Sequence, residues 1–294
     1  MSFIRQLGVK RLVSFFVTPL VILYLLLFVE FVPDNPRVGY TFCVALLMAV
    51  WWITEVVPLA VTSLIPVALF PLFGIMDGRA VSATYFNDVI FLFMGGFLVA
   101  LAMEKWDLHR RIAFRILCFT GTSPAKILLG FMAASFFLSM WISNTATVMM
   151  MLPIAMAIIS QLDSLMGNKS SDKFSIAILL AIAYGASTGG VATLVGTPPN
   201  LSFVRIYHIY FPDAVEVSFY KWMLFALPVS LMITAFIWAL LYFLFRPKGK
   251  EWQDIDKHTF VNQLKDMGRV TPEQKIVMTL FSLLALLWIT RIDI

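Results

Sequence analysis

Polar side chains interrupt a long apolar segment at its centre. The 36 residues between positions 126 and 163 carry no charge, yet Ser143, Asn144 and Thr145 stand in their middle, with Ser139 one helical turn earlier. The side-chain amide of an asparagine is costly to bury in an apolar medium unless it finds hydrogen-bond partners. These four residues therefore indicate a polar site inside an otherwise apolar part of the molecule.

A second interruption lies downstream, in the sequence YGASTGGVATLVGTPPNLSF at 184–203. An apolar helix that begins near Ser175 meets two glycines there and then Pro198 and Pro199. The two prolines remove backbone donors and break a helix, whereas proline suits the first turn of a new one. The pattern predicts a discontinuous membrane helix with an unwound middle. The alternative is a span that ends at Gly190, followed by a loop outside the bilayer.

The oxygen atoms at the two interruptions are suited to small ions. Ser139 and Ser143 lie four residues apart, so their hydroxyls share one helical face. The Asn144 side-chain oxygen and a carbonyl near Gly196 would complete a set of neutral oxygens. Hard cations take oxygen ligands, and a set without a carboxylate favours Na+ over a divalent ion. Thr145, at the start of the returning helix, would present its hydroxyl and the helix N-terminus to an anion.

The composition places the elements that carry these residues in a lipid bilayer. The chain has 294 residues, of which 60% are hydrophobic and 13% charged, and its mean hydropathy is +0.88. Soluble domains carry roughly 25% charged residues. The chain is therefore predicted to be an all-α, polytopic membrane protein. Helices are expected at about 12–32, 39–56, 58–75, 86–104, 125–142, 146–162, 174–192, 201–211, 221–245 and 274–293.

The distribution of Lys and Arg predicts one orientation. Basic residues flank the first span, which puts the N-terminus in the cytoplasm of a multi-pass protein of the cell membrane. Following the spans in turn places 17 of the 22 Lys and Arg residues inside. The basic residues behind the net charge of +5 are then interpreted as loop residues that set the orientation in the membrane, and no nucleic-acid partner is expected.

This orientation puts residues 126 and 163 on the same side of the membrane, so the segment between them must go up and return. Each arm has about 26 Å of helix at ~1.5 Å per residue, and the turn contains no charge. The pattern predicts a re-entrant hairpin at 125–162 whose tip stays at membrane depth, where irregular backbone must be buried or line a wet cavity. Two ordinary spans joined by a tight turn are the alternative.

The remaining reactive residues point to no second chemistry. Cys43 and Cys118 have no metal-site spacing and imply no disulfide framework. His109, His208 and His258 are far apart and are interpreted as surface residues. A metal-binding His/Glu motif, a serine nucleophile elbow and a phosphate loop are all missing from the sequence, so the chain is not expected to be an enzyme.

Broken helices of this kind hold ions and substrates in secondary transporters. The chain resembles the N-terminal half of the divalent anion:sodium symporter family, which comprises carriers of succinate, other C4-dicarboxylates, citrate or sulfate. The resemblance covers most of residues 38–245. It rests on AVWWITEVVPLAVTSLIPV (49–67), FLFMGGFLVALAMEKW (91–106), SMWISNTATVMMMLPIA (139–155) and GVATLVGTPPN (190–200).

The resemblance implies roles for the matching positions. The first sodium site is implied at Ser139, Ser143, Asn144 and Gly196. Half of the substrate carboxylate site is implied at Asn144 and Thr145, with Thr197 nearby. Glu55, at a helix end, is expected to have a structural role rather than a role in ion coupling.

The resemblance also implies an elevator-type homodimer built from two inverted repeats. On that pattern the chain divides into an N-terminal span (1–35), scaffold spans (36–105), transport elements (106–210), a further span (221–245), a cytoplasmic linker (246–273) and the incomplete start of a second repeat (274–294). The transport elements are an amphipathic helix, the re-entrant hairpin (125–162) and the broken helix (174–211).

The sequence departs from the family pattern in one respect. It contains one Ser-Asn-Thr hairpin and stops at Ile294, so half of the binding site and a C-terminal half are expected to be missing. Sodium-coupled uptake of divalent anions is the expected function, with this chain as the N-terminal part of the carrier. The alternative is a truncated or split half that does not transport by itself.

Overall fold

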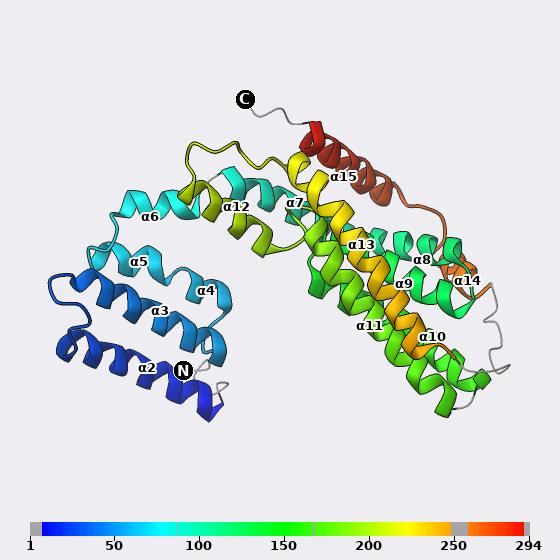
Figure 1. Cartoon of the computed structure of the whole chain (residues 1–294), viewed down its shortest axis with the longest axis horizontal. Coiled ribbons are helices and arrows are strands. Elements are labelled where there is room, and N and C mark those ends of the chain that lie inside the picture. Colours follow the sequence, from blue (N-terminus) through cyan, green and yellow to red (C-terminus); the bar gives the residue numbers. More distant parts are fainter. Residues whose placement is uncertain (1–7, 87, 167, 248–257, 291–294) are drawn as a thin grey trace. The chain divides into compact units, whose positions relative to one another are not determined.

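The computed structural model describes residues 8–86, 88–166, 168–247 and 258–290. Within these ranges the ordered elements are helices and no strand occurs, which confirms the all-α prediction. The chain forms two compact units, Met1–Phe91 and Leu92–Ile294, and each is described by itself. The helices are labelled as in Figure 1.

The first unit begins with two long apolar helices that pack against each other (Figure 1). Ile22, Cys43 and Leu47 form their shared core. At the end of the second of these helices Glu55 adopts a left-handed conformation and its carboxylate pairs with Arg11 at 2.8 Å, exposed to solvent. The helices of this unit are α2 (Val9–Phe28), α3 (Pro36–Thr54), α4 (Leu59–Ser63), α5 (Ile65–Leu72) and α6 (Gly78–Tyr85).

Two features of the first unit differ from the sequence prediction. The single helix expected at 58–75 is divided between α4 and α5, because Pro66 has no backbone donor with which to continue the ladder past Leu64. The residues 77–79, which lie between the helices expected at 58–75 and 86–104, instead form the start of α6 with Asp77 as its N-cap. The Asp77 carboxylate accepts a hydrogen bond from the Ala80 backbone nitrogen at 2.8 Å, which is a helix N-cap.

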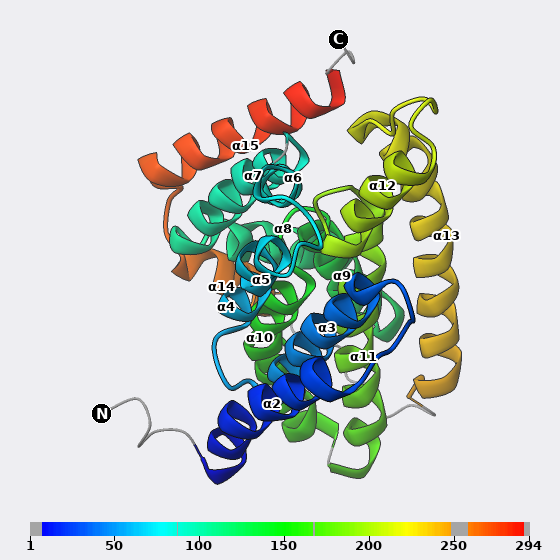
Figure 2. The same cartoon turned by 90° about the vertical axis from the view of Figure 1, so that its left-hand side faces the viewer.

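The second unit contains the elements expected to carry the site. The central helix α11 packs against α9, α10 and α13, and Figures 1 and 2 show α11 beside α10. The helices are α7 (Asp88–Lys105), which begins in the first unit, α8 (Leu108–Thr120), α9 (Pro124–Ser139), α10 (Asn144–Met166), α11 (Asn168–Ala192), α12 (Pro198–Tyr210), α13 (Phe219–Phe245), α14 (His258–Asp266) and α15 (Pro272–Thr290). Helix α11 starts at Asn168, earlier than the predicted 174.

Glycines bring α11 into close contact with the backbone of α9. A Cβ atom at Gly185 would lie 2.6 Å from the Met132 carbonyl oxygen, and one at Gly189 would overlap the Phe136 carbonyl. Small residues at a helix interface allow backbones to approach in this way within a membrane. The arrangement fixes α9, the first arm of the hairpin, against the helix that leads to the second interruption.

Six helices of the described residues are long and apolar enough to cross a membrane: α2, α3, α10, α11, α13 and α15. Helix α9 is apolar but shorter, with 16 residues. The chain is a multi-pass membrane protein.

The interpretation of His109 as a surface residue is wrong. The side chain lies on the inner face of the amphipathic helix α8 and is only 6% exposed. Its Nδ1 atom is 2.8 Å from the Met103 carbonyl oxygen, so the buried ring has a polar partner. His208 is half-buried, and the side chain of His258 lies outside the described residues.

Candidate functional site

The hairpin tip is a short turn from Met140 to Ser143 between α9 and α10. The backbone nitrogen of Ile142 donates to the Leu138 carbonyl at 3.0 Å and so closes the end of α9. Ser143 then caps α10, which begins at Asn144, because its Oγ atom accepts from the Ala146 nitrogen at 3.2 Å. The turn thus places the C-terminus of one helix beside the N-terminus of the next.

Ser139 and Asn144 join the two arms directly. The Ser139 hydroxyl donates to the Asn144 Oδ1 atom at 2.6 Å. Ser139 is fully buried and Asn144 is half-buried. The polar pair that the sequence placed inside an apolar segment is therefore formed at the tip, where each side chain gives the other a partner.

The second interruption forms a bridge, residues 193–197, between α11 and α12. The Gly196 backbone nitrogen donates to the Thr193 hydroxyl at 3.1 Å. The Asn200 amide donates to the Gly190 carbonyl at 2.9 Å and to the Thr193 carbonyl at 2.7 Å. These bonds satisfy carbonyls that the end of α11 leaves without helical partners. The helix is therefore broken at the predicted motif, and its broken end is held by side chains.

The hairpin tip and the bridge meet. The Thr193 hydroxyl donates to the Met140 carbonyl at 2.5 Å, across 53 positions of sequence. A Cβ atom at Gly196 would lie 2.9 Å from the Ser139 carbonyl oxygen and 2.5 Å from the Gly190 carbonyl oxygen. These contacts bring backbone oxygens from both interruptions to one place.

Gly190, near the end of α11, lies against the Asn144 side chain of the hairpin tip. A Cβ atom at Gly190 would overlap the Asn144 Oδ1 atom. The absence of a side chain at Gly190 therefore leaves room for the amide of Asn144 beside the end of α11. The oxygens that converge here belong to neutral groups, namely the Asn144 amide and the carbonyls of Ser139 and Gly190.

The structure brings some of the predicted site residues together and leaves others at the edge. Ser139, Asn144 and Gly196 share the contact between tip and bridge. Ser143 is exposed and caps α10, although its hydroxyl has a second lone pair. Thr145 is exposed in the first turn of α10, and Thr197 is half-buried directly before α12. Both threonines therefore stand at helix N-termini, where the helix dipole favours an anion.

Two residues of the site had no predicted role, Thr193 and Asn200. Both are buried, with 0% and 6% of their surface exposed. Their only signal in the sequence was polarity within a broken apolar segment. Asn200 also belongs to the Gly-Thr-Pro-Pro-Asn motif, but a motif does not reveal which carbonyls an amide will bind.

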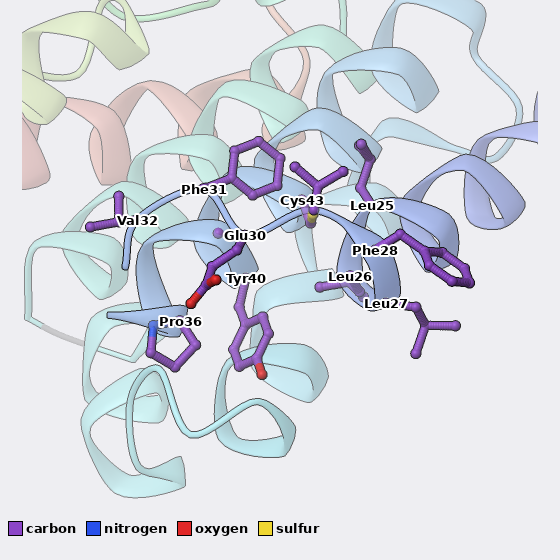
Figure 3. Close-up of a pocket in the computed structure, with 12 residues that line it drawn as sticks. Leu25, Leu26, Leu27, Phe28, Glu30, Phe31, Val32, Pro36, Tyr40 and Cys43 are labelled. Atoms are coloured by element: carbon purple, nitrogen blue, oxygen red, sulfur yellow. The ribbon is translucent and has the colours of Figure 1, made fainter. Parts of the chain in front are cut away.

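A separate cavity of about 340 Å³ lies in the first unit, between the end of α2 and the start of α3 (Figure 3). Its lining is mainly apolar, and Glu30 supplies the one acidic side chain among the lining residues. It contains none of the predicted site residues. The polar groups that converge at the tip and bridge make that region the better candidate site.

A multi-span helical protein in which a hairpin tip meets an unwound helix has the architecture of a secondary transporter. The family model described as "Sodium:sulfate symporter transmembrane region" matches residues 10–294, and the chain belongs to this family. Its family membership confirms two sequence predictions, the resemblance to sodium-coupled anion carriers and the expectation that the chain is not an enzyme.

Individual relatives agree with the family assignment. The chain is 40% identical over 297 residues to a sodium-dependent dicarboxylate transporter, SdcS, of Staphylococcus saprophyticus. It is 42% identical over 293 residues to the protein of the same name from Staphylococcus aureus strain USA300. Each match covers 98% of this chain and 56% of the relative, so the chain spans about half the length of these relatives.

Proposed function

We propose that this chain supplies the sodium site and part of the anion site of a sodium-coupled carrier of C4-dicarboxylates such as succinate. The observation that carries the proposal is the contact between the hairpin tip and the bridge, where neutral oxygens converge in an apolar surrounding. The relatives named as sodium-dependent dicarboxylate transporters support the choice of ion and substrate. Sulfate is the competing substrate, because the family description names it.

The sodium ion is assigned to the oxygens of Ser139, Ser143, Asn144 and Gly196. Oxygen ligands suit a hard cation, and the carbonyl ends of α9 and α11 carry partial negative charge at this place. Sodium would also reduce the electrostatic cost of bringing an anion next to these carbonyls. This would make anion binding depend on prior sodium binding, which is the requirement for coupling.

The anion is assigned to Asn144, Thr145 and Thr197. The Asn144 amide nitrogen can donate to a carboxylate while its oxygen faces the ion, and the two threonine hydroxyls stand at the N-termini of α10 and α12. Because the relatives are longer than the matched segment, we assign only part of the anion site to these residues. We further propose a homodimer in the cell membrane with a cytoplasmic N-terminus.

Uptake into proteoliposomes tests this function. The protein at its full encoded length is reconstituted, and uptake of labelled succinate is measured with an inward sodium gradient and with choline in place of sodium. We expect uptake in sodium and none above background in choline. Competition with unlabelled sulfate then decides between the two anions. Equal uptake in sodium and choline would contradict sodium coupling, and absence of uptake of succinate, citrate and sulfate would contradict the function.

A further inference from the structure

Arg111 is a buried cation on α8 that plays no part in the proposed ion site. Its side chain is 5% exposed. The Nε atom donates to the Gln274 Oε1 atom at 2.9 Å. The Nη1 atom donates to the Gly268 carbonyl at 2.9 Å, and the Nη2 atom donates to the Met267 carbonyl at 2.9 Å.

The acceptors of Arg111 are neutral. Among the residues that the structure describes, the ion pairs join Arg11 to Glu55 and Arg110 to Asp107, and neither involves Arg111. A buried charge without a counter-ion is strongly destabilising unless its hydrogen bonds are satisfied. Here the acceptors lie just past the C-terminus of α14, where the helix dipole is negative. Gly268, with a φ of 66°, turns the chain so that successive carbonyls face the guanidinium.

Gln274 extends this contact to a third segment. Its side chain is 4% exposed and its Nε2 atom donates to the Trp106 carbonyl at 2.8 Å. Arg111 and Gln274 therefore connect the corner between α7 and α8, the turn at 267–271 and the first turn of α15. We call this group of hydrogen bonds the Arg111 clasp.

Helix α8 is in turn packed tightly on the first arm of the hairpin. A Cβ atom at Gly130 of α9 would overlap the Thr120 hydroxyl and lie 3.1 Å from the Leu117 Cδ2 atom. A displacement of α9 therefore cannot leave α8 in place without opening this contact. Through α8, the clasp thereby connects the turn at 267–271 with α9, the first arm of the hairpin.

We propose that Arg111 is a positioning residue that fastens the 267–271 turn and the start of α15 to α8, so that α8 keeps a fixed position at the base of the hairpin. The Nε and Nη donors form a planar fork that reaches several acceptors at once, which a lysine ammonium on one stem cannot do. The consequence for transport rests on the proposed function. Loss of the clasp slows turnover and leaves substrate affinity unchanged, because the partners of Arg111 are not residues of the proposed ion and anion sites.

Trypsin cleavage of the Arg269–Val270 bond measures the clasp without any transport assay. Arg269 is exposed and lies within the clasped turn. Cleavage of a folded segment follows the population of its open form. We expect Arg111→Gln to accelerate cleavage of this bond in the detergent-solubilised full-length protein by about tenfold or more, since several hydrogen bonds to a charged group are lost together. Peptides are identified by mass spectrometry, so that other trypsin sites do not interfere.

Matched variants separate the clasp from a general loss of folding. Arg110→Gln removes an adjacent, exposed arginine and should leave the cleavage rate unchanged. Gln274→Met removes two of the hydrogen bonds but keeps Arg111, and it should accelerate cleavage by a smaller factor. An unchanged rate in both Arg111→Gln and Gln274→Met would overturn the proposal. Acceleration by Arg110→Gln to the same extent would also overturn it.

Uptake kinetics then test the connection with transport. We expect Arg111→Gln to lower the maximal rate of sodium-driven uptake with little change in KM, and Arg111→Lys to recover part of that rate. A rise in KM at an unchanged maximal rate would contradict the positioning role. If the wild-type protein itself shows no sodium-driven uptake, the proposed function fails, whereas the cleavage result for the clasp still stands.

Discussion

At the scale of single residues, the bond between the Ser139 hydroxyl and the Asn144 amide oxygen sets the orientation of the amide. The donor is fully buried and the bond is 2.6 Å long. Without it the amide loses a fixed direction, and one oxygen leaves the proposed sodium site. We expect Ser139→Ala to raise the sodium concentration for half-maximal uptake by about tenfold, the equivalent of one strong hydrogen bond.

The sodium dependence of succinate uptake measures this effect. Ser82→Ala is the matched control, because Ser82 is an exposed serine of α6 in the other unit. If Ser139→Ala and Ser82→Ala show the same sodium dependence as the wild type, Ser139 is not a sodium ligand and does not orient one.

Thr193 is the residue that connects the bridge to the hairpin tip. Its hydroxyl donates to the Met140 carbonyl and accepts from the Gly196 nitrogen. Thr193→Val keeps the shape but removes the donor to the Met140 carbonyl and leaves the Gly196 nitrogen with its longer bond of 3.4 Å to the Thr193 carbonyl. The loss of a partner for a buried group destabilises by about 1–3 kcal/mol. Sodium stabilises the wild type against heat if it binds the folded state. We expect the variant to unfold at a lower temperature and to gain less stability from sodium.

Thermal unfolding in detergent, with and without sodium, checks this prediction. Thr41→Val is the control, because Thr41 is exposed and its hydroxyl donates to the Arg37 carbonyl of its own helix. A sodium-induced rise in the unfolding temperature that is equal in Thr193→Val and the wild type would argue against a sodium site at this contact.

The sequence could predict only those contacts of the site that join residues close together in the chain. Ser139 and Asn144 are five positions apart, so a turn between them was enough to bring them together. Thr193 and Met140 are 53 positions apart, and their contact depends on how α11 packs on α9. The same limit explains His109, whose burial depends on the helix that covers it rather than on its own polarity.

At the scale of elements, the close approach of α9 and α11 holds the hairpin beside the broken helix. Gly189→Ala would place a methyl group on the Phe136 backbone, which the helices cannot accommodate without moving apart. Overpacking of this kind destabilises by about 1–3 kcal/mol. We expect a lower unfolding temperature and weaker sodium-driven uptake, because separation of the helices also separates the bridge from the tip.

Gly95→Ala provides the comparison, since a Cβ at Gly95 of α7 has no neighbour within 4 Å among the residues that the structure describes. Alanine there should maintain or slightly raise stability, because it favours the helix more than glycine does. Unfolding temperatures of the two variants in the same detergent decide the matter. Equal stability of Gly189→Ala and Gly95→Ala would mean that α9 and α11 do not pack as closely as described.

Helices could be predicted from the sequence where a long apolar segment defines them. They were predicted less well where a proline or an N-cap residue sets the helix end. The broken helix was expected because Pro198 and Pro199 follow glycines within an apolar segment. The division between α4 and α5 was missed, since the apolar segment 58–75 predicted a single helix. Helix α6 was missed because Asp77 and Gly78 resemble a turn, although an aspartate is also a good N-cap.

At the scale of the whole molecule, the proposed orientation is open to direct measurement. A cysteine at Asn35, in the exposed loop after α2, should react with a membrane-impermeant thiol reagent in intact cells. A cysteine at Arg110, in α8, should react only after permeabilisation. Cys43 is fully buried, and burial raises the pKa of the Cys118 thiol, so the native cysteines contribute little labelling. The reverse labelling pattern would contradict a cytoplasmic N-terminus.

The central claim is that the hairpin tip and the bridge form a sodium and anion site, and Asn144 takes part in both halves of it. The most direct test is sodium-driven succinate uptake by Asn144→Ala, in the protein at its full encoded length. Asn35→Ala is the control, because it removes an exposed amide from the first unit. We predict that Asn144→Ala abolishes uptake at wild-type membrane abundance while Asn35→Ala retains it. Uptake by Asn144→Ala at the wild-type rate and sodium dependence would contradict the account.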